Sequence, residues 1–108
     1  RRLACAYQAA FINNEFCDFF NGPKESFSNN WLNTILLKGE DITVLNRVLE
    51  ELNSSGLGCR PIWSLLSDLP HFRNNPQMPL SIAKSITNKV INIPSSAFLD
   101  PSHIGPLM

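Results

Sequence analysis

Hydrophobic residues recur along the first twelve positions of the chain with the spacing of a helix. One face of that helix would carry Leu3, Tyr7, Ala10 and Phe11. The segment has no capping residue at its start, and Arg1 and Arg2 stand where the helix dipole disfavours cations. The pattern predicts a helix over residues 1–12, ended by Asn13-Asn14, and we expect its true start to lie upstream of Arg1.

Two further helical patterns follow. In the first, Asp41 can cap the start and Gly56 can supply a left-handed end. Its expected buried stripe is Ile42, Leu45, Val48, Leu49 and Leu52, and its solvent side is Arg47, Glu50 and Glu51. A third helix can start at Pro79, which suits a first turn, and would bury Ile82, Ala83 and Ile86. Three helices are therefore expected.

Strands are expected where β-branched and aromatic residues cluster between turn residues. These segments are 16–20, 31–37, 57–60 and 90–93. Pro61 interrupts the next strand position, and the prolines up to Pro79 keep the following stretch irregular. The succession of strand, helix and strand has the size of a βαβ-like unit. We predict an α/β (α+β) two-layer sandwich over residues 1–99, with a small, mostly antiparallel or mixed sheet, helices largely on one face, and a mobile tail over 100–108.

Composition narrows the class of protein. The 108 residues are 44% hydrophobic, enough for one core, and nine basic residues balance nine acidic ones. A net charge of zero gives no electrostatic case for nucleic acid or an anionic membrane as partner. No apolar run approaches the ~20 residues of a membrane span, and the start lacks the features of a signal peptide. Three widely spaced cysteines favour buried free thiols, so a cytoplasmic location is expected.

Standard catalytic motifs are missing from the sequence, and the histidines His71 and His103 have no partner at metal-ligand spacing. What stands out is the order of three short motifs. These are Asn29-Asn30-Trp31-Leu32, then Cys59-Arg60-Pro61-Ile62-Trp63, then Ile91-Asn92-Ile93-Pro94-Ser95-Ser96. In this order they resemble the C-terminal domain of the DegT/DnrJ family of pyridoxal-phosphate-dependent nucleotide-sugar aminotransferases. The resemblance runs from Arg1 to about Ala97, and is closest to members of the legionaminic acid and perosamine pathways.

The resemblance implies the small domain of a dimeric fold-type I enzyme, in which the large N-terminal domain holds the cofactor and the active-site lysine. The small domain would supply part of the cleft wall and help to hold the sugar nucleotide. Matched to the family's motifs, the substrate-binding residues would be Arg60, Trp63, Asn30 and Trp31. A guanidinium suits a phosphate or carboxylate, and an indole offers a flat face to a sugar or base. Pro61 would fix the backbone between them.

Each of these residues also has a structural interpretation. Arg60 could pair with a carboxylate, Trp31 and Trp63 could fill the core, and Asn30 could cap a turn. The segment 93–96 could end a strand and contact nothing. These alternatives stay open at the level of sequence.

Two departures from the family pattern bear on activity. Ser67 stands where the family commonly has a histidine, and a hydroxyl cannot supply imidazole chemistry. The lysines are Lys24, Lys38, Lys84 and Lys89, and none lies in a setting like the family's lysine motif. We therefore expect a fragment that binds no pyridoxal phosphate and is inactive alone, with a large domain or a second copy as partner and a nucleotide sugar as ligand. The alternative is a stand-alone, non-catalytic binding or oligomerisation module.

Overall fold

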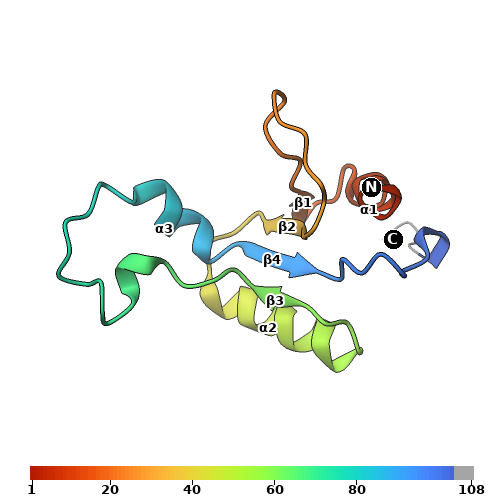
Figure 1. Ribbon diagram of the computed structural model, residues 1–108. Helices are drawn as coiled ribbons and strands as arrows, with labels where there is room; N and C mark the ends of the chain where they lie inside the picture. Colours follow the sequence, from red (N-terminus) through yellow and green to blue (C-terminus); the bar gives the residue numbers. More distant parts are fainter. Residues whose placement is uncertain (104–108) are drawn as a thin grey trace.

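The computed structural model describes residues 1–103, which form three α-helices and four strands (Figure 1). The helices are α1 (Arg2–Phe11), α2 (Ile42–Ser54) and α3 (Ser81–Thr87), and the strands are β1 (Cys17–Phe19), β2 (Asn33–Leu37), β3 (Arg60–Pro61) and β4 (Val90–Ile93). Two short 3-10 turns, η1 (Leu66–Asp68) and η2 (Pro101–His103), complete the order. The chain is a small α+β domain with an antiparallel sheet, and the predicted fold class is confirmed.

The sheet has the strand order β1-β2-β4-β3, and each neighbouring pair is antiparallel. β2 and β3 are both antiparallel to β4, so they run parallel to each other with β4 between them. The unit β2–α2–β3 is thus a split βαβ arrangement. The strand expected over 57–60 is wrong in its bounds, because pairing with β4 begins only at Arg60 and includes Pro61. Proline is tolerated there because β3 is an edge strand.

The core lies on one face of the sheet. Alternation along the strands puts Cys17, Ile35, Ile91 and Ile93 on that face, since residues paired across antiparallel strands share a side. Leu45 and Leu49 of α2 pack against them, and Tyr7 and Phe11 bring α1 to the same cluster. The predicted two-layer sandwich with helices largely on one face agrees with this packing of α1 and α2.

Local chemistry fixes the ends of α2. The carboxylate of Asp41 accepts hydrogen bonds from the backbone N–H of Thr43 at 2.8 Å and from its hydroxyl at 2.7 Å. Gly56 has a φ of 84°, as the C-terminal signal predicted. Two residues assigned to the core are exposed instead, Ile42 at 44% and Ile82 at 78%. Ile42 stands in the first turn of its helix, outside the cluster formed by Leu45 and Leu49.

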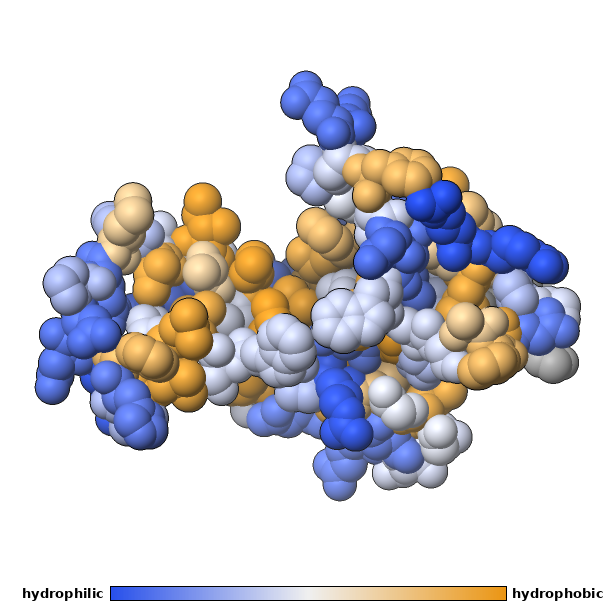
Figure 2. Space-filling model, viewed as in Figure 1, coloured by the Kyte–Doolittle hydropathy of each residue, from blue (hydrophilic) through white to orange (hydrophobic). Residues whose placement is uncertain are grey.

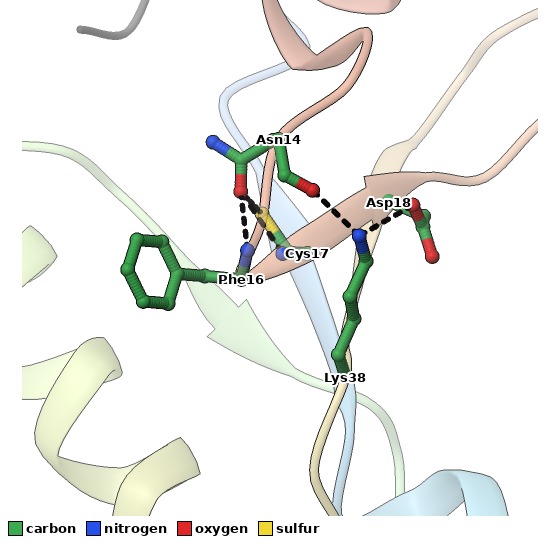
Figure 3. A network of polar contacts seen from close by, with 5 residues as sticks. All are labelled: Asn14, Phe16, Cys17, Asp18 and Lys38. Atoms are coloured by element: carbon green, nitrogen blue, oxygen red, sulfur yellow. Dashed lines mark hydrogen bonds and ion pairs between the residues drawn. The ribbon is translucent and has the colours of Figure 1, made fainter.

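The turn between α1 and β1 is held by a compact polar network (Figure 3). The side-chain oxygen of Asn14 accepts from the backbone N–H of Phe16 at 2.9 Å and of Cys17 at 3.0 Å. The ammonium group of Lys38 donates to the Asn14 carbonyl at 2.6 Å and lies 3.6 Å from the carboxylate of Asp18. These contacts tie the edge strand β1 to the end of β2.

The C-terminal segment crosses back to α1, where η2 lies beside it (Figure 1). The backbone N–H of Ser102 donates to the carboxylate of Asp100 at 2.9 Å. Residues 104–108 of the expected mobile tail lie outside the described residues, and the tail remains a prediction. From Arg1 to His103, no helix has both the length and the apolar composition needed to cross a bilayer.

The chain exposes more surface than a folded monomer of its mass normally does. Its accessible area is 8552 Å², against about 6,000 Å² expected from the scaling of monomeric proteins. Its radius of gyration is 15.3 Å, against about 13 Å for a compact domain of this length. Figure 2 shows apolar side chains gathered on the lobe built from residues 62–86, at the left of the view. Exposed members of that lobe are Trp63, Leu66, Phe72, Met78 and Ile82.

Candidate functional site

The face of the sheet opposite the core carries a row of polar side chains. Thr34 of β2 is paired with Asn92 of β4, and Asn92 is paired with Arg60 of β3. The Thr34 hydroxyl donates to the side-chain oxygen of Asn92 at 2.9 Å, which fixes the orientation of that amide. Adjacent strands lie about 4.8 Å apart, so the row extends over roughly 10 Å. We call these three residues the polar row.

Arg60 ends the polar row at the free edge of the sheet. It is exposed, and within residues 1–103 it forms no ion pair with a carboxylate. The structural bridge considered for it is therefore absent from the part of the chain described. A planar guanidinium that is held on a strand and faces solvent has its donors free for a phosphate or carboxylate. The role of Arg60 in substrate binding stays a prediction.

Both tryptophans lie on the surface, with Trp63 at 78% and Trp31 at 69% exposure. The alternative interpretation, in which they fill the core, is wrong. Trp31 was assigned to a strand, but β2 begins only at Asn33, and Trp31 lies in a bend before it. Trp63 lies just beyond the end of β3, on an extended stretch before η1. Two open indole faces on one small domain are surface that another molecule can cover.

Asn30 lies in the wall of a cavity of about 400 Å³ between the first half of α1 and the connection from β1 to β2. Thr34 lines the same cavity, so one end of the polar row opens into it. The Arg1 guanidinium lies 4.0 Å from the centre of the Phe27 ring at its rim. Cys5, the one cysteine found exposed, also lines it, which corrects the expectation that all three thiols are buried.

Turn capping before β2 is done by the neighbours of Asn30. The side-chain oxygen of Asn29 accepts from the backbone N–H of Trp31 at 3.0 Å, and the Ser28 hydroxyl accepts from the N–H of Asn30 at 3.0 Å. Asn30 itself has a φ of 54°, a left-handed conformation that asparagine tolerates. Its side-chain amide makes no hydrogen bond with any described residue, so it is available to a ligand in the cavity.

The segment after β4 does more than end a strand, contrary to the interpretation that it contacts nothing. The Ser95 hydroxyl accepts from the backbone N–H of Asn33 at 2.7 Å and donates to the carbonyl of Ile93 at 2.8 Å. Asn33 and Ile93 are paired residues of β2 and β4, so the hydroxyl stands between their backbone groups. The Tyr7 hydroxyl donates to the Pro94 carbonyl at 3.0 Å, which joins α1 to the same segment. These contacts are structural.

Ser67 is the residue that departs from the motif of the family that the sequence resembles. It lies in η1, and its hydroxyl oxygen is buried without a hydrogen-bond partner among residues 1–103. An unsatisfied buried hydroxyl is uncommon in a folded protein and marks a place where water or another group can bind. The sequence singled out Ser67 only because it stands in place of an expected histidine. Burial of its hydroxyl oxygen could not be predicted, because it depends on tertiary packing.

The cavity beside α1 does not fit pyridoxal phosphate. Lys38 is engaged by Asn14 and Asp18, and Lys89 by Glu40 at 2.7 Å. No lysine lines the cavity beside α1, whereas the cofactor needs a lysine amine that faces its binding site.

Burial raises the pKa of both the Cys17 and Cys59 thiols, which disfavours the thiolate form. Residues 1–103 also hold no group of three side chains able to bind a metal ion.

Comparison with known proteins bears on the fold. No protein-family model matches the sequence, and no curated protein matches it. Among solved structures, the chain is similar to Helicobacter pylori PseC, an aminotransferase involved in the biosynthesis of pseudoaminic acid. The TM-score is 0.81 and the sequence identity 21%, over 94% of this chain and 29% of that one. The chain therefore spans less than a third of that enzyme's length, and it has the fold of one part of an aminotransferase.

Proposed function

We propose that this chain is the C-terminal small domain of a pyridoxal-phosphate-dependent nucleotide-sugar aminotransferase of the DegT/DnrJ type, working in the cytoplasm. In this proposal it is not catalytic alone and forms one wall of an active-site cleft. The observation that carries the proposal is the backbone likeness to PseC, with a TM-score of 0.81 over 94% of the chain. The ordered motifs around Trp31, Arg60 and Pro94 support the same family independently of the backbone.

The exposed surface supports a large partner domain. The excess over a typical monomer is about 2,500 Å² on this chain alone, which is as much as one partner contributes to a large or obligate interface. Its apolar part includes the lobe over residues 62–86, where Met78 is 81% exposed. Exposed apolar area of this extent favours a covering partner, because water is excluded from it when the partner binds.

The proposed role of the polar row is to hold the anionic part of the substrate. Arg60 offers a charged fork at one end, and the cavity with Asn30 lies at the other. Trp63 follows Arg60 by three residues and offers a flat face for a sugar or base. Pyridoxal phosphate, supplied by the large domain, would carry out the amine transfer. The residues of this chain would bind and orient the substrate only.

A direct test is the coding DNA upstream of the Arg1 codon. The proposal expects an open reading frame that continues into a large domain bearing a lysine for the cofactor. An in-frame stop with no such domain would instead support a stand-alone binding or oligomerisation module. Purified chain mixed with pyridoxal phosphate and glutamate should show no lasting absorbance of a lysine-bound cofactor and no amine transfer. Turnover by this chain alone would overturn the proposal.

A further inference from the structure

The hydrogen bond between Thr34 and Asn92 gives the polar row a direction. β4, which carries Asn92, lies between β2 with Thr34 and β3 with Arg60. The single proton of the Thr34 hydroxyl is donated to the side-chain oxygen of Asn92 at 2.9 Å. The oxygen and nitrogen of an amide lie on diverging bonds, so an oxygen held towards β2 turns the nitrogen towards the β3 side. The Asn92 amide therefore presents its N–H groups, and not its oxygen, to the strand that carries Arg60.

Both side chains at this end of the polar row have free donors. Within residues 1–103 the Asn92 amide nitrogen has no acceptor, and Arg60 has no carboxylate partner. Residues paired across antiparallel strands have Cβ atoms about 5 Å apart, which brings the two groups within reach of one ligand. Asp18 shares this face of the sheet, but it lies on β1, two strands away from β4, beside Lys38. The free edge of the sheet therefore offers N–H donors and a positive charge, which suit an anion.

We propose that the Arg60 guanidinium and the Asn92 amide nitrogen together bind one phosphate group, with Thr34 as the positioning residue that holds the amide. A carboxylate is planar and is matched by the guanidinium fork alone. A phosphate group carries three acceptor oxygens around a tetrahedral centre, so a second donor on the neighbouring strand has an oxygen of its own. That this phosphate belongs to a nucleotide sugar rests on the proposed function. The phosphate site itself rests on the strand register and on the Thr34 hydrogen bond.

Thr34 contributes to this site without touching the ligand. Its hydroxyl contacts the Asn92 oxygen on the side of β4 that faces away from Arg60. Without the hydroxyl, both orientations of the amide are open, because its oxygen and nitrogen have nearly the same shape. In the reversed orientation the amide oxygen lies towards Arg60, where it accepts from the guanidinium and repels an anion. Thr34 is therefore expected to change the affinity for phosphate only through Asn92.

Nuclear magnetic resonance of the full chain tests the site. The probe is inorganic pyrophosphate, added at constant ionic strength because salt screens surface charges. The side-chain N–H signals of Asn92 and the Nε–H signal of Arg60 should shift together, with a single dissociation constant. Succinate, a dicarboxylate, should bind more weakly and shift the Arg60 signal without shifting those of Asn92. Stationary Asn92 signals in pyrophosphate, or equal shifts with succinate, would overturn the proposal.

Variants separate direct contact from positioning. Asn92→Ala should raise the dissociation constant for pyrophosphate about tenfold, because it removes a hydrogen bond to a charged group. Thr34→Val, which has nearly the same shape without the hydroxyl, should raise it about threefold, and Thr34→Ser should keep the original value. In the Asn92→Ala background, Thr34→Val should cause no further loss. Circular dichroism checks that each variant is folded. A further loss in that background, or no loss from Thr34→Val alone, would refute positioning through Asn92.

Failure of this site and failure of the aminotransferase proposal are distinguishable. A chain that does not bind pyrophosphate lacks the phosphate site, whereas the reading frame upstream of the Arg1 codon still decides whether a large domain precedes it. An in-frame stop there, combined with Asn92-dependent binding of pyrophosphate, would remove the aminotransferase proposal and support the phosphate site.

Discussion

Replacing Ser95 with alanine should destabilise the sheet at the junction of β2 and β4. The hydroxyl joins the backbone N–H of Asn33 to the carbonyl of Ile93 at 2.7 and 2.8 Å. Asn33 is 2% exposed and Ile93 is also buried, so neither backbone group has easy access to water. Ser95→Ala removes the partner of both groups at once.

The expected loss in the free energy of unfolding can be worked out from those two backbone groups. A buried donor or acceptor left without a partner costs about 1–3 kcal/mol. Ser95 itself is only half-buried, so water can satisfy part of the loss. We expect a total of about 2 kcal/mol, which lowers the melting temperature of a domain of this size by roughly 10 °C.

The assay is thermal and urea unfolding followed by circular dichroism, with amide hydrogen exchange at Asn33 as a local readout. Ser96→Ala is the matched control, because the Ser96 hydroxyl makes only a 3.4 Å contact with the N–H of Phe98 at an exposed site. Ser95→Thr retains a hydroxyl and should keep most of the stability. If Ser95→Ala unfolds like Ser96→Ala, or if Asn33 exchanges at an unchanged rate, the bridging role of the hydroxyl is refuted.

Three further predictions follow from single sites. The side-chain hydrogen bond from Thr43, and then the one from its backbone N–H, hold the pKa of the Asp41 carboxyl below its ordinary value of 3.8. The ionised Asp41 cap therefore stabilises the fold above that pH, and this stabilisation is lost as the pH falls through the lowered pKa. Melting curves of Asp41→Asn should lack this acid dependence. A maleimide at neutral pH should label Cys5 alone, with the buried Cys17 and Cys59 reacting only in denaturant, as mass spectrometry of the labelled peptides would show. Arg60→Ala should leave the melting temperature unchanged and weaken binding of a uridine diphosphate sugar about tenfold in calorimetry; equal affinity would remove Arg60 from the proposed site.

The sequence predicted those elements that are fixed by neighbouring residues or by a repeating hydrophobic pattern. The cap at Asp41 and the left-handed Gly56 delimit α2 without reference to the rest of the chain, because capping is local chemistry. The β-branched residues at 90–93 identify β4, in which Ile91 and Ile93 share the face that carries the core cluster. The third helix was placed by Pro79, but it starts at Ser81 and buries less than expected.

Features that depend on distant partners were not predictable. β3 is a two-residue strand whose existence rests on pairing with Asn92, more than 30 residues later, and no propensity within 57–61 reports that pairing. The bridge formed by Ser95 needs both paired strands in place before a hydroxyl can stand between them. The polar row likewise arises from register, because Thr34 and Arg60 are neighbours of Asn92 only in the folded sheet.

The apolar residues that were placed wrongly share one property. Ile42 and Ile82 were assigned to buried stripes, and packing was the structural alternative for Trp31 and Trp63. All four are exposed in the structure. Hydrophobic periodicity and residue type indicate which side chains are buried in the complete protein, and these include side chains that a partner covers. A domain that leaves such residues in water while its own core is complete at Leu45 and Ile91 has unused apolar surface. Exposed apolar residues of this kind favour a partner that covers them, as the proposed large domain would.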